Sequence, residues 1–390
     1  MHENTQVVII GAGPAGLTLA NLLLRTGVAC VVLERRSRSY VEHRQRAGVL
    51  DHSATRVFEE WGLADTLLAG VPGDGTLEIR LNGEPRYLDL PALAGGRTGR
   101  VIPQQLLVRR LVSAFLDGGG DLRFDAGEVT PHDVDGARPT VTYRDPAGTV
   151  HEIACDYVAG CDGYHGVSRA TVPAEAATAY SFDHGIGWIT VLADAPPPRL
   201  PLFGISSHGF AAQFPRGPAA SRFYLQCAQD CSPSDWSDER VWEQLRLRLG
   251  DKALPAGPIS EKAVVEMRSF VLDPMRYGRL FLLGDAAHII TPVGGKGMNL
   301  AIGDANALAH ALREALRDGD ERRLDDYSAT RLQKVWNQQE FCRWLTEMTH
   351  DAGDATQAGP FRQQLARARL DRLFTSPAAA HAFADLMTGD

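Results

Sequence analysis

Apolar and polar positions at the start of the chain follow two periods in turn. Val7–Ile10 is an uninterrupted apolar run, which is typical of a strand buried inside a parallel sheet. From Pro14 to Arg25 the apolar residues recur at helical spacing, and Gly27 predicts the end of that helix. Val28–Leu33 is a second β-rich run. The pattern therefore predicts a strand, a helix and a second strand, as in an α/β unit.

Three glycines, Gly11, Gly13 and Gly16, occupy the turn between the first strand and the helix as G-x-G-x-x-G. They permit a tight bend, a close approach of a pyrophosphate and close packing of helix on strand. The helix N-terminus offers free N–H groups to the phosphates. Glu34 ends the second strand, where its carboxylate can bind a ribose 2′-hydroxyl and would repel a 2′-phosphate. We therefore expect the adenosine half of FAD or NAD, rather than NADP; the alternative is a glycine-rich turn of another α/β unit.

Length and composition are those of an ordinary globular chain. The 390 residues are 44% hydrophobic and 23% charged, which predicts about two to three domains without disulfide or metal staples. No long apolar run occurs and Met1–Gln6 is too short and polar for a signal peptide, so we expect a cytoplasmic protein. The net charge of −8 argues against nucleic acid or an anionic membrane as a partner. Six scattered cysteines predict free, mostly buried thiols.

A basic stretch follows Glu34. Its five arginines within twelve residues are Arg35, Arg36, Arg38, Arg44 and Arg46. Charge alone favours a solvated loop. The alternative is an anion site beside the first cofactor, and since Glu34 disfavours a 2′-phosphate there, a second phosphorylated ligand such as NADPH would occupy it.

Glycine-rich turns end two further apolar runs. The first reaches Asp162-Gly163, which either supports a phosphate loop or forms a simple strand-to-helix turn. The second, Leu280–Leu283, ends at Gly284-Asp285, where the Asp285 carboxylate could accept a hydrogen bond from a ribityl hydroxyl.

A glycine-rich loop, PVGGKG at residues 292–297, opens a helical pattern over Met298–Leu312. Such a loop can hold a developing anion, for example the N1–C2=O region of a reduced flavin. His288 precedes the loop and is a candidate acid or base. A histidine flanked by Ala287 and Ile289 is more often structural, and we favour that interpretation.

The rest of the pattern predicts a sheet-based part followed by helices. Alternation around Asn82-Gly83 predicts a hairpin over Leu77–Asp89. Helical periodicity then disappears between Ser181 and Tyr224. The antiparallel strands expected there are Trp188–Leu192, Phe203–Ser206, Phe210–Phe214 and Arg222–Cys227.

These motifs, in this order, resemble those of the group A flavoprotein aromatic hydroxylases, over nearly the whole chain. The similarity is greatest to the branch that hydroxylates 4-hydroxybenzoate, through segments at 46–51, 160–169, 235–242, 268–274 and 284–301. The resemblance implies an α/β fold with an FAD-binding Rossmann-like three-layer domain, a β-rich substrate domain and a helical C-terminal cap. The expected division is an FAD-binding domain at 1–75, 98–180 and 269–320, a hairpin at 76–97 that joins the substrate domain at 181–268, and a helical C-terminal region at 321–390.

The resemblance assigns FAD contacts to all three motifs and to the loop after them. They are Gly11, Gly13, Pro14, Ala15, Gly16, Glu34, Arg35, Arg44, Gln104, Asp162, Asp285, Pro292, Gly295, Lys296, Gly297, Met298 and Asn299. It also implies NADPH as co-substrate, which agrees with the anion-site interpretation of the basic stretch. The matching NADPH positions are Arg35, Tyr40, Arg46, His165 and Arg268.

The resemblance further places a substrate pocket. Arg216 keeps the arginine that binds the substrate carboxylate, and Tyr224 keeps its tyrosine helper. Arg222 matches an arginine that steers the flavin between its inner and outer positions, and Pro292 matches a residue whose carbonyl lines the pocket.

Four positions depart from that pattern. Phe214 replaces the serine of the carboxylate site, and Phe203 replaces the tyrosine that deprotonates the substrate phenol. Met387 and Asp74 stand where the family has the tyrosine and surface histidine of its proton relay. Phenylalanine and methionine carry no exchangeable proton. We therefore expect an intact cofactor half and a substrate half rewritten for a larger or less polar ring.

The implied activity is that of an FAD-dependent monooxygenase that consumes NADPH and O₂ and hydroxylates an aromatic ring through a flavin C4a-hydroperoxide. We expect a phenol, hydroxypyridine or aminoarene as substrate, with natural-product tailoring as a setting, and a homodimer or higher homo-oligomer. One alternative is activity on 4-hydroxybenzoate itself. Another is an oxidative cyclase or epoxidase for a larger apolar substrate, and a third is a flavin-binding protein without hydroxylation.

Overall fold

The computed structural model describes residues 2–44, 48–73, 75–350 and 360–389. A six-stranded sheet has the order β18-β19-β12-β2-β3-β8, in which all neighbours run parallel except β18 and β19. Its strands are β2 (Val7–Ile10), β3 (Cys30–Leu33), β8 (Asp121–Arg123), β12 (Tyr157–Gly160), β18 (Arg276–Tyr277) and β19 (Leu280–Leu282). The central strands β2 and β12 are buried along their whole length, which explains their apolar sequence.

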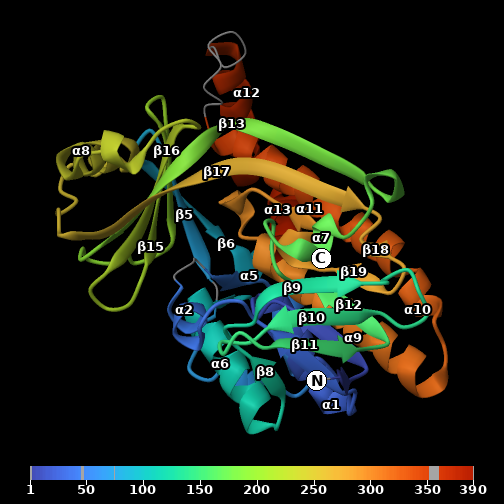
Figure 1. The fold of residues 1–390 in the computed structure, drawn as a ribbon. Helices are drawn as coiled ribbons and strands as arrows, with labels where there is room; N and C mark the ends of the chain where they lie inside the picture. Colours follow the sequence, from blue (N-terminus) through green and yellow to red (C-terminus); the bar gives the residue numbers. More distant parts are fainter. Residues whose placement is uncertain (1, 45–47, 74, 351–359, 390) are drawn as a thin grey trace.

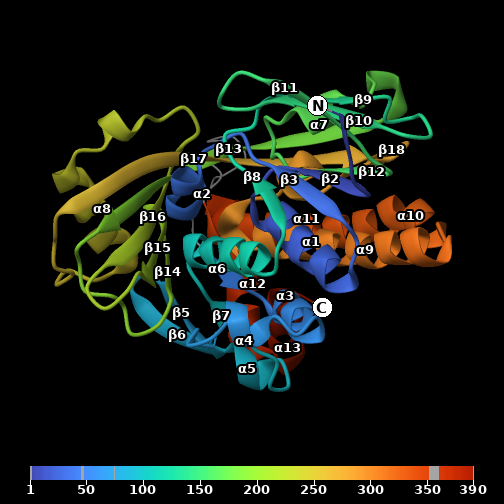
Figure 2. The ribbon, with the colours of Figure 1, turned by 60° about the horizontal axis from the view of Figure 1, so that its bottom comes forward.

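Layers cover both faces of this sheet, as Figure 2 shows. Helices α1 (Pro14–Thr26), α6 (Gln104–Asp117) and α9 (Gly297–Asp318) lie on one face, and α1 packs against both of the others. On the other face lies a four-stranded sheet of β1 (His2–Asn4), β11 (Val150–Ala154), β10 (Thr140–Arg144) and β9 (Gly127–His132). The predicted three-layer α/β arrangement is therefore confirmed.

A second large sheet forms the other side of the molecule (Figure 1) and has the order β20-β17-β13-β16-β15-β14-β5-β6. Its strands are β5 (Thr76–Leu81), β6 (Glu84–Asp89), β13 (Thr178–Ala193), β14 (Leu202–Ser206), β15 (Gly209–Pro215), β16 (Ser221–Ala228), β17 (Ile259–Asp273) and β20 (His288–Ile289). Helix α8 (Asp238–Leu249) packs on β14 and β15, where Trp236 and Trp242 belong to a separate hydrophobic core. This confirms the predicted β-rich part.

Two strands are longer than the sequence pattern predicts. The expected strand at 188–192 is one section of β13, which pairs antiparallel with β17 from Thr178 opposite Asp273 to Ala193 opposite Ile259. Both strands cross the molecule (Figure 1) and span the predicted boundaries at 181 and 268. The division of the chain into domains stays a prediction.

The C-terminal part is helical, as predicted. It consists of α10 (Arg322–Asp325), α11 (Tyr327–Thr349), α12 (Pro360–Thr375) and α13 (Pro377–Thr388). The smaller elements are α2 (Arg38–His43), β4 (Val49–Leu50), α3 (His52–Glu60), α4 (Ala64–Leu67), α5 (Leu90–Leu93), β7 (Arg100–Val101), α7 (Val167–Ala170) and the 3₁₀ turns η1 (Ala174–Ala176), η2 (Pro233–Asp235), η3 (Gly284–Ala286) and η4 (Pro292–Gly294).

The predictions about cysteines hold. All six are free, and four of them are buried. Within the described ranges, no helix has both the length and the apolar character needed to cross a membrane. The same residues contain no group of three or more His, Cys, Asp or Glu side chains arranged to hold a metal ion.

A buried ionic network fixes the third glycine turn to the helix that follows it. Asp304 of α9 is fully buried and accepts hydrogen bonds from the Gly284 N–H (3.0 Å), His288 Nε2 (2.8 Å) and Arg331 Nε (2.7 Å). Burial raises the pKa of Asp304, but attraction to His288 and Arg331 outweighs burial and lowers that pKa from 3.8 to about 2. His288 is 1% exposed, so its contacts agree with the structural interpretation.

Replacing this carboxylate should destabilise the protein. We expect Asp304→Asn to lower the free energy of unfolding at pH 7 by about 3 kcal/mol, because it leaves Arg331 without its buried charge partner. A lowered pKa means that the contribution of Asp304 is present above pH 3.8 and is lost as the pH falls toward 2. The difference between wild type and variant, measured by urea unfolding, should therefore shrink across that interval.

Asp318→Asn provides a matched control, because Asp318 lies on the same helix and is exposed. Its effect should stay within about 0.5 kcal/mol. Equal unfolding midpoints for the two variants would show that the Asp304 network does not hold the turn.

Candidate active site

The three glycine motifs meet at one edge of the six-stranded sheet. Strands β2, β12 and β19 are adjacent and parallel, so the turns at Gly11, Asp162 and Gly284 follow neighbouring carboxyl ends. Gly11 has a φ of +104°, and a Cβ atom there would lie 2.5 Å from the Cys161 carbonyl oxygen. Glycine is therefore required where the first two turns approach each other. Open α/β sheets bind ligands at this kind of edge.

The first turn has room for a pyrophosphate. A Cβ atom at Gly16 would lie 2.0 Å from the Gly11 carbonyl oxygen, whereas one at Gly13 would meet no described atom within 4 Å. Gly13 thus leaves open space at the N-terminus of α1, which begins with Pro14 and Ala15, and no described side chain caps it. Helix N–H groups facing open space are the donor set that a diphosphate requires.

Glu34 lies directly beside this turn. Its carboxylate accepts hydrogen bonds from the backbone N–H groups of Ala12 and Arg36, both at 2.8 Å. The same carboxylate therefore faces the glycine turn and has a fixed position. A ribose held there would meet the acceptor that the sequence predicts.

The two acidic motifs are not equivalent. Asp162 accepts a hydrogen bond from the Ser168 N–H at 2.9 Å, so one of its oxygens stabilises the turn into α7. Burial raises the pKa of Asp162, and its other carboxylate oxygen is buried without a described partner. Asp285 is exposed at the sheet edge, next to Gly284, whose Cβ position lies 3.5 Å from Ala15 of α1. Asp285 is therefore the acid that faces outward from this edge.

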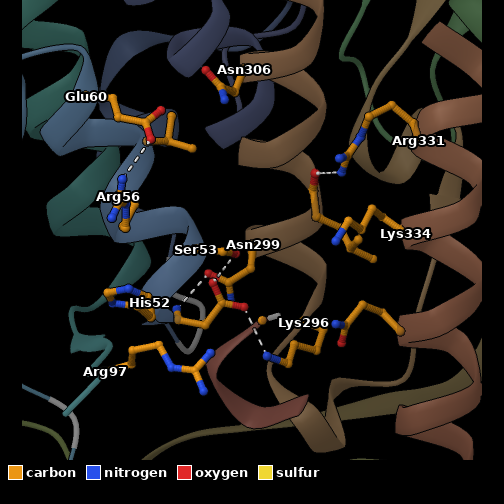
Figure 3. Close-up of a pocket in the computed structure, with 15 residues that line it drawn as sticks. His52, Ser53, Arg56, Glu60, Arg97, Lys296, Asn299, Asn306, Arg331 and Lys334 are labelled. Carbon is orange, nitrogen blue, oxygen red and sulfur yellow. Dashed lines mark hydrogen bonds and ion pairs between the residues drawn. The ribbon is translucent and has the colours of Figure 1, made fainter. Parts of the chain in front are cut away.

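The loop before α9 is held from behind by its polar side chains. Lys296 is 1% exposed and donates to Asp51 Oδ2 (3.0 Å) and to the Met387 carbonyl of α13 (2.8 Å), as Figure 3 shows for the ion pair. Asn299 donates to the carbonyl oxygens of Val49 and Gly295. These contacts leave the backbone of 292–298 as the part of the loop that can face a cofactor.

Three of the predicted NADPH positions fall into two groups, Arg268 and His165 around Tyr164 and Tyr40 beside Arg36. Arg268 and Arg169 lie with their guanidinium carbons 4.1 Å from the centroid of the Tyr164 ring, and His165 makes an edge contact with that ring. In the second group, Arg36 lies over the Tyr40 ring at 5.1 Å.

Other predicted cofactor positions differ in exposure. Arg35 and Arg44 are exposed, and Gln104 begins α6 and is half-buried. Arg46 lies outside the described residues, as does Asp74 of the expected relay.

Aromatic rings line the centre of the eight-stranded sheet. Phe203 and Phe214 meet edge to face, with their centroids 6.0 Å apart and their planes at 68°, and Phe214 meets Tyr224 edge to face at 5.8 Å and 85°. Two further rings were predicted only as parts of strands and not as pocket residues: Trp188, which lies 4.8 Å from Tyr224, and Phe210, which lies 5.4 Å from Phe203. Four strands thus build one aromatic cluster, which is buried except at the half-buried Phe214.

His350 closes this cluster from the end of α11. Trp188 Nε1 donates to His350 Nε2 at 2.8 Å, and the His350 ring lies 4.2 Å from Phe210. Burial lowers the pKa of His350 to about 3, so the imidazole is neutral and its Nε2 is the acceptor. No sequence motif indicated this residue, because it is far along the chain from the strands that it contacts.

The predicted arginines lie beside the cluster. Arg216 Nη2 donates to Gln105 Oε1 at 3.4 Å, and burial lowers the pKa of Arg216. Arg222 is 7% exposed and donates to Glu261 and Thr190. Burial also raises the pKa of Tyr224, so its hydroxyl stays protonated near neutral pH.

Comparisons with known proteins agree with this geometry. A family model described as an FAD binding domain matches residues 4–342. The p-hydroxybenzoate hydroxylase of Acinetobacter baylyi is 38% identical over 99% of this chain and 95% of its own. Aklavinone 12-hydroxylase DnrF of Streptomyces peucetius is 26% identical over 84% of this chain and 71% of its own. Among solved structures, p-nitrophenol 4-monooxygenase PnpA of Pseudomonas putida shares the fold with a TM-score of 0.84, at 20% identity over 99% of this chain and 98% of that chain.

The matched region contains all three glycine turns, the loop before α9 and the aromatic cluster. The alignment with the relative at 38% identity covers nearly the full length of both chains. The chain therefore belongs to the FAD binding domain family and is an FAD-dependent monooxygenase of the group A flavoprotein aromatic hydroxylases.

Proposed function

We propose that this enzyme uses NADPH and O₂ to hydroxylate an aromatic ring that carries its own strong electron donor: a phenol, a hydroxypyridine or an aminoarene. The observation that carries the proposal is the cluster of Phe203, Phe214 and Tyr224, whose rings pack edge to face, with the Arg216 guanidinium close enough to Tyr224 to interact with it electrostatically. A planar ring suits such walls, because edge-to-face contacts favour aromatic partners.

FAD would be held at the edge where the three motifs meet. The first turn of α1 would bind the diphosphate, Glu34 the adenosine ribose and Asp285 the ribityl chain, with the backbone of 292–298 beside the ring system. Bound FAD supplies the hydride-accepting and oxygen-activating chemistry. The chain's own residues bind the cofactor, orient the aromatic substrate and exclude water, as the burial of Trp188 and Phe210 indicates.

The absence of hydroxyl groups at 203 and 214 sets the substrate preference. A hydroxylated pocket wall can hydrogen-bond and deprotonate a phenol, whereas phenylalanine can do neither. We therefore expect the ring's own substituent to provide its reactivity, without a proton relay from the protein. Arg216 would pair with an acidic substituent on the substrate.

The second candidate is 4-hydroxybenzoate itself as the substrate. The 38% identity to p-hydroxybenzoate hydroxylase favours it. If 4-hydroxybenzoate is the substrate, the enzyme must bind and activate it without side-chain hydroxyl groups at positions 203 and 214. The first candidate substrates need no such hydroxyl groups.

The experiment that tests the proposal follows NADPH oxidation by the FAD-loaded enzyme in air. Phenols, hydroxypyridines and aminoarenes are added singly, with 4-hydroxybenzoate as reference, and products are identified by mass. One added oxygen on a ring and stimulation stronger than with 4-hydroxybenzoate support the proposal. Stimulation by 4-hydroxybenzoate alone favours the second candidate, and a new ring bond or an epoxide indicates a cyclase or epoxidase.

Introducing hydroxyl groups at positions 203 and 214 should raise the activity on 4-hydroxybenzoate. We expect the double variant Phe203→Tyr, Phe214→Ser to raise kcat/KM for 4-hydroxybenzoate by roughly 10²-fold, because it returns a general-base route and a carboxylate partner. Phe182→Tyr makes the same kind of change at an exposed ring and should leave kcat/KM unchanged. An equal response of both variants would contradict the assignment of the pocket.

The rings and cations around Tyr164 should govern NADPH binding. We expect Arg268→Ala to raise KM for NADPH by roughly tenfold or more, with the FAD content unchanged, because a charge-assisted contact to the dinucleotide is lost. Arg144→Ala, at an exposed arginine of β10, is the matched control. A KM that stays constant in Arg268→Ala would remove this surface from the NADPH site.

A further inference from the structure

A polar cavity lies behind the loop that precedes α9, between α3, α9 and α11. Its volume is about 530 Å³, which is within the range of small-molecule sites. Figure 3 shows Arg56 and Glu60 on the α3 side, Asn306 on α9, and Lys334 on the α11 side. Lys296 and Asn299 form the wall toward the loop, and their polar atoms are already bonded within the protein. Among the described residues, the lining includes Lys296 and Asn299 but none of the three glycine turns, Glu34 or Asp285, so the cavity lies apart from the predicted diphosphate and ribose contacts.

A buried amide in this wall lacks a hydrogen-bond partner. Gln338 of α11 lines the cavity and is 8% exposed, yet its Oε1 atom has no partner among the described residues. A buried acceptor left unpaired costs stability, and a donor supplied by a ligand relieves that cost. The ligand should therefore carry a hydroxyl or amino group.

The charges of the wall leave one cation uncompensated. Five cations line the cavity, and four of them have carboxylate partners: Arg56 with Glu60, Arg97 with Asp385, Lys296 with Asp51 and Arg331 with Asp304. Lys334 is exposed toward the cavity and has no carboxylate partner within the described ranges. A ligand with one negative charge would balance the wall.

The remaining lining groups are mixed donors and acceptors. They include His52, Ser53 and Asn306, and Val57 and Leu300 contribute apolar surface beside them. From the unpaired Gln338 acceptor, the uncompensated Lys334 cation and this polar lining, we propose that the cavity is a second small-molecule site, for a polyhydroxylated organic anion. Arg331, Lys334 and Gln338 recur at helical spacing on α11. One face of this helix therefore presents both the Lys334 ammonium and the Gln338 amide to the cavity.

The test measures binding to the FAD-loaded enzyme by isothermal titration calorimetry with four probes. Gluconate carries a carboxylate and hydroxyls, hexanoate carries the carboxylate without hydroxyls, glucose carries hydroxyls without charge, and glucose 6-phosphate replaces the carboxylate by a phosphate. The proposal requires gluconate or glucose 6-phosphate to bind at least roughly tenfold more tightly than hexanoate and glucose. The better of the two identifies the anionic group. Equal binding of all four probes, or binding of none of them, overturns the proposed second site.

Two variants assign any binding to this cavity. Gln338→Leu keeps the side-chain volume but removes the acceptor, and Lys334→Glu reverses the charge at an exposed position. Each should weaken the favoured probe by roughly tenfold or more. Lys252→Glu makes the same charge change at an exposed lysine outside the cavity and should leave the affinity unchanged. Equal affinities in Lys334→Glu and Lys252→Glu would place the bound probe elsewhere and overturn the proposal.

Discussion

The parallel pairing of β19, β12 and β2 is the constraint on which the rest of the structure depends. Because their hydrogen bonds fix the three strands side by side, the turns after them must emerge at the same edge. Gly11 then lies so close to the Cys161 carbonyl that a side chain could not be accommodated. Segments separated by more than a hundred residues in sequence thus form one surface of backbone N–H and carboxylate groups. The long helix α9 begins at this surface, and the buried carboxylate of Asp304 ties it to the turn at Gly284.

The sequence predicted the parts of the fold that have a local cause. Val7–Ile10, the helix after it and the αL residue Gly27 each follow from periodicity or from backbone freedom within a short segment. The strands over 203–206, 210–214 and 222–227 lie within one residue of β14, β15 and β16 at each end. The full lengths of β13 and β17 could not be predicted from the local sequence pattern. Their outer halves are exposed or alternate irregularly, and they are strands because they pair with each other.

The candidate site shows the same division between local and non-local causes. Backbone-based features, such as the open space at Gly13, follow from the glycine pattern. His350 could not be predicted, because its place against Trp188 and Phe210 results from the packing of α11 on a distant sheet. The position of Lys296 in the loop suggested a cofactor contact. A buried ammonium needs a counter-charge. The Asp51 carboxylate supplies it, and the Met387 carbonyl accepts a second hydrogen bond from the same ammonium. The partners of a buried charge are tertiary facts that residue type alone does not specify.

This division also explains how one half of such an enzyme can change while the other is retained. The proposed FAD edge depends on backbone geometry, so a substitution at Gly11 or Gly16 would disturb the packing of strand, turn and helix together. The aromatic cluster depends on side chains carried by strands whose pairing does not involve them. A tyrosine or serine that loses its substrate partner would leave a buried hydroxyl unpaired, at a cost of about 1–3 kcal/mol. Phenylalanine at 203 and 214 removes that cost and adds ring contacts to Phe210 and Tyr224. The absence of hydroxyl groups at 203 and 214 is therefore compatible with a stable cluster, and the proposed substrate would supply its own electron donor.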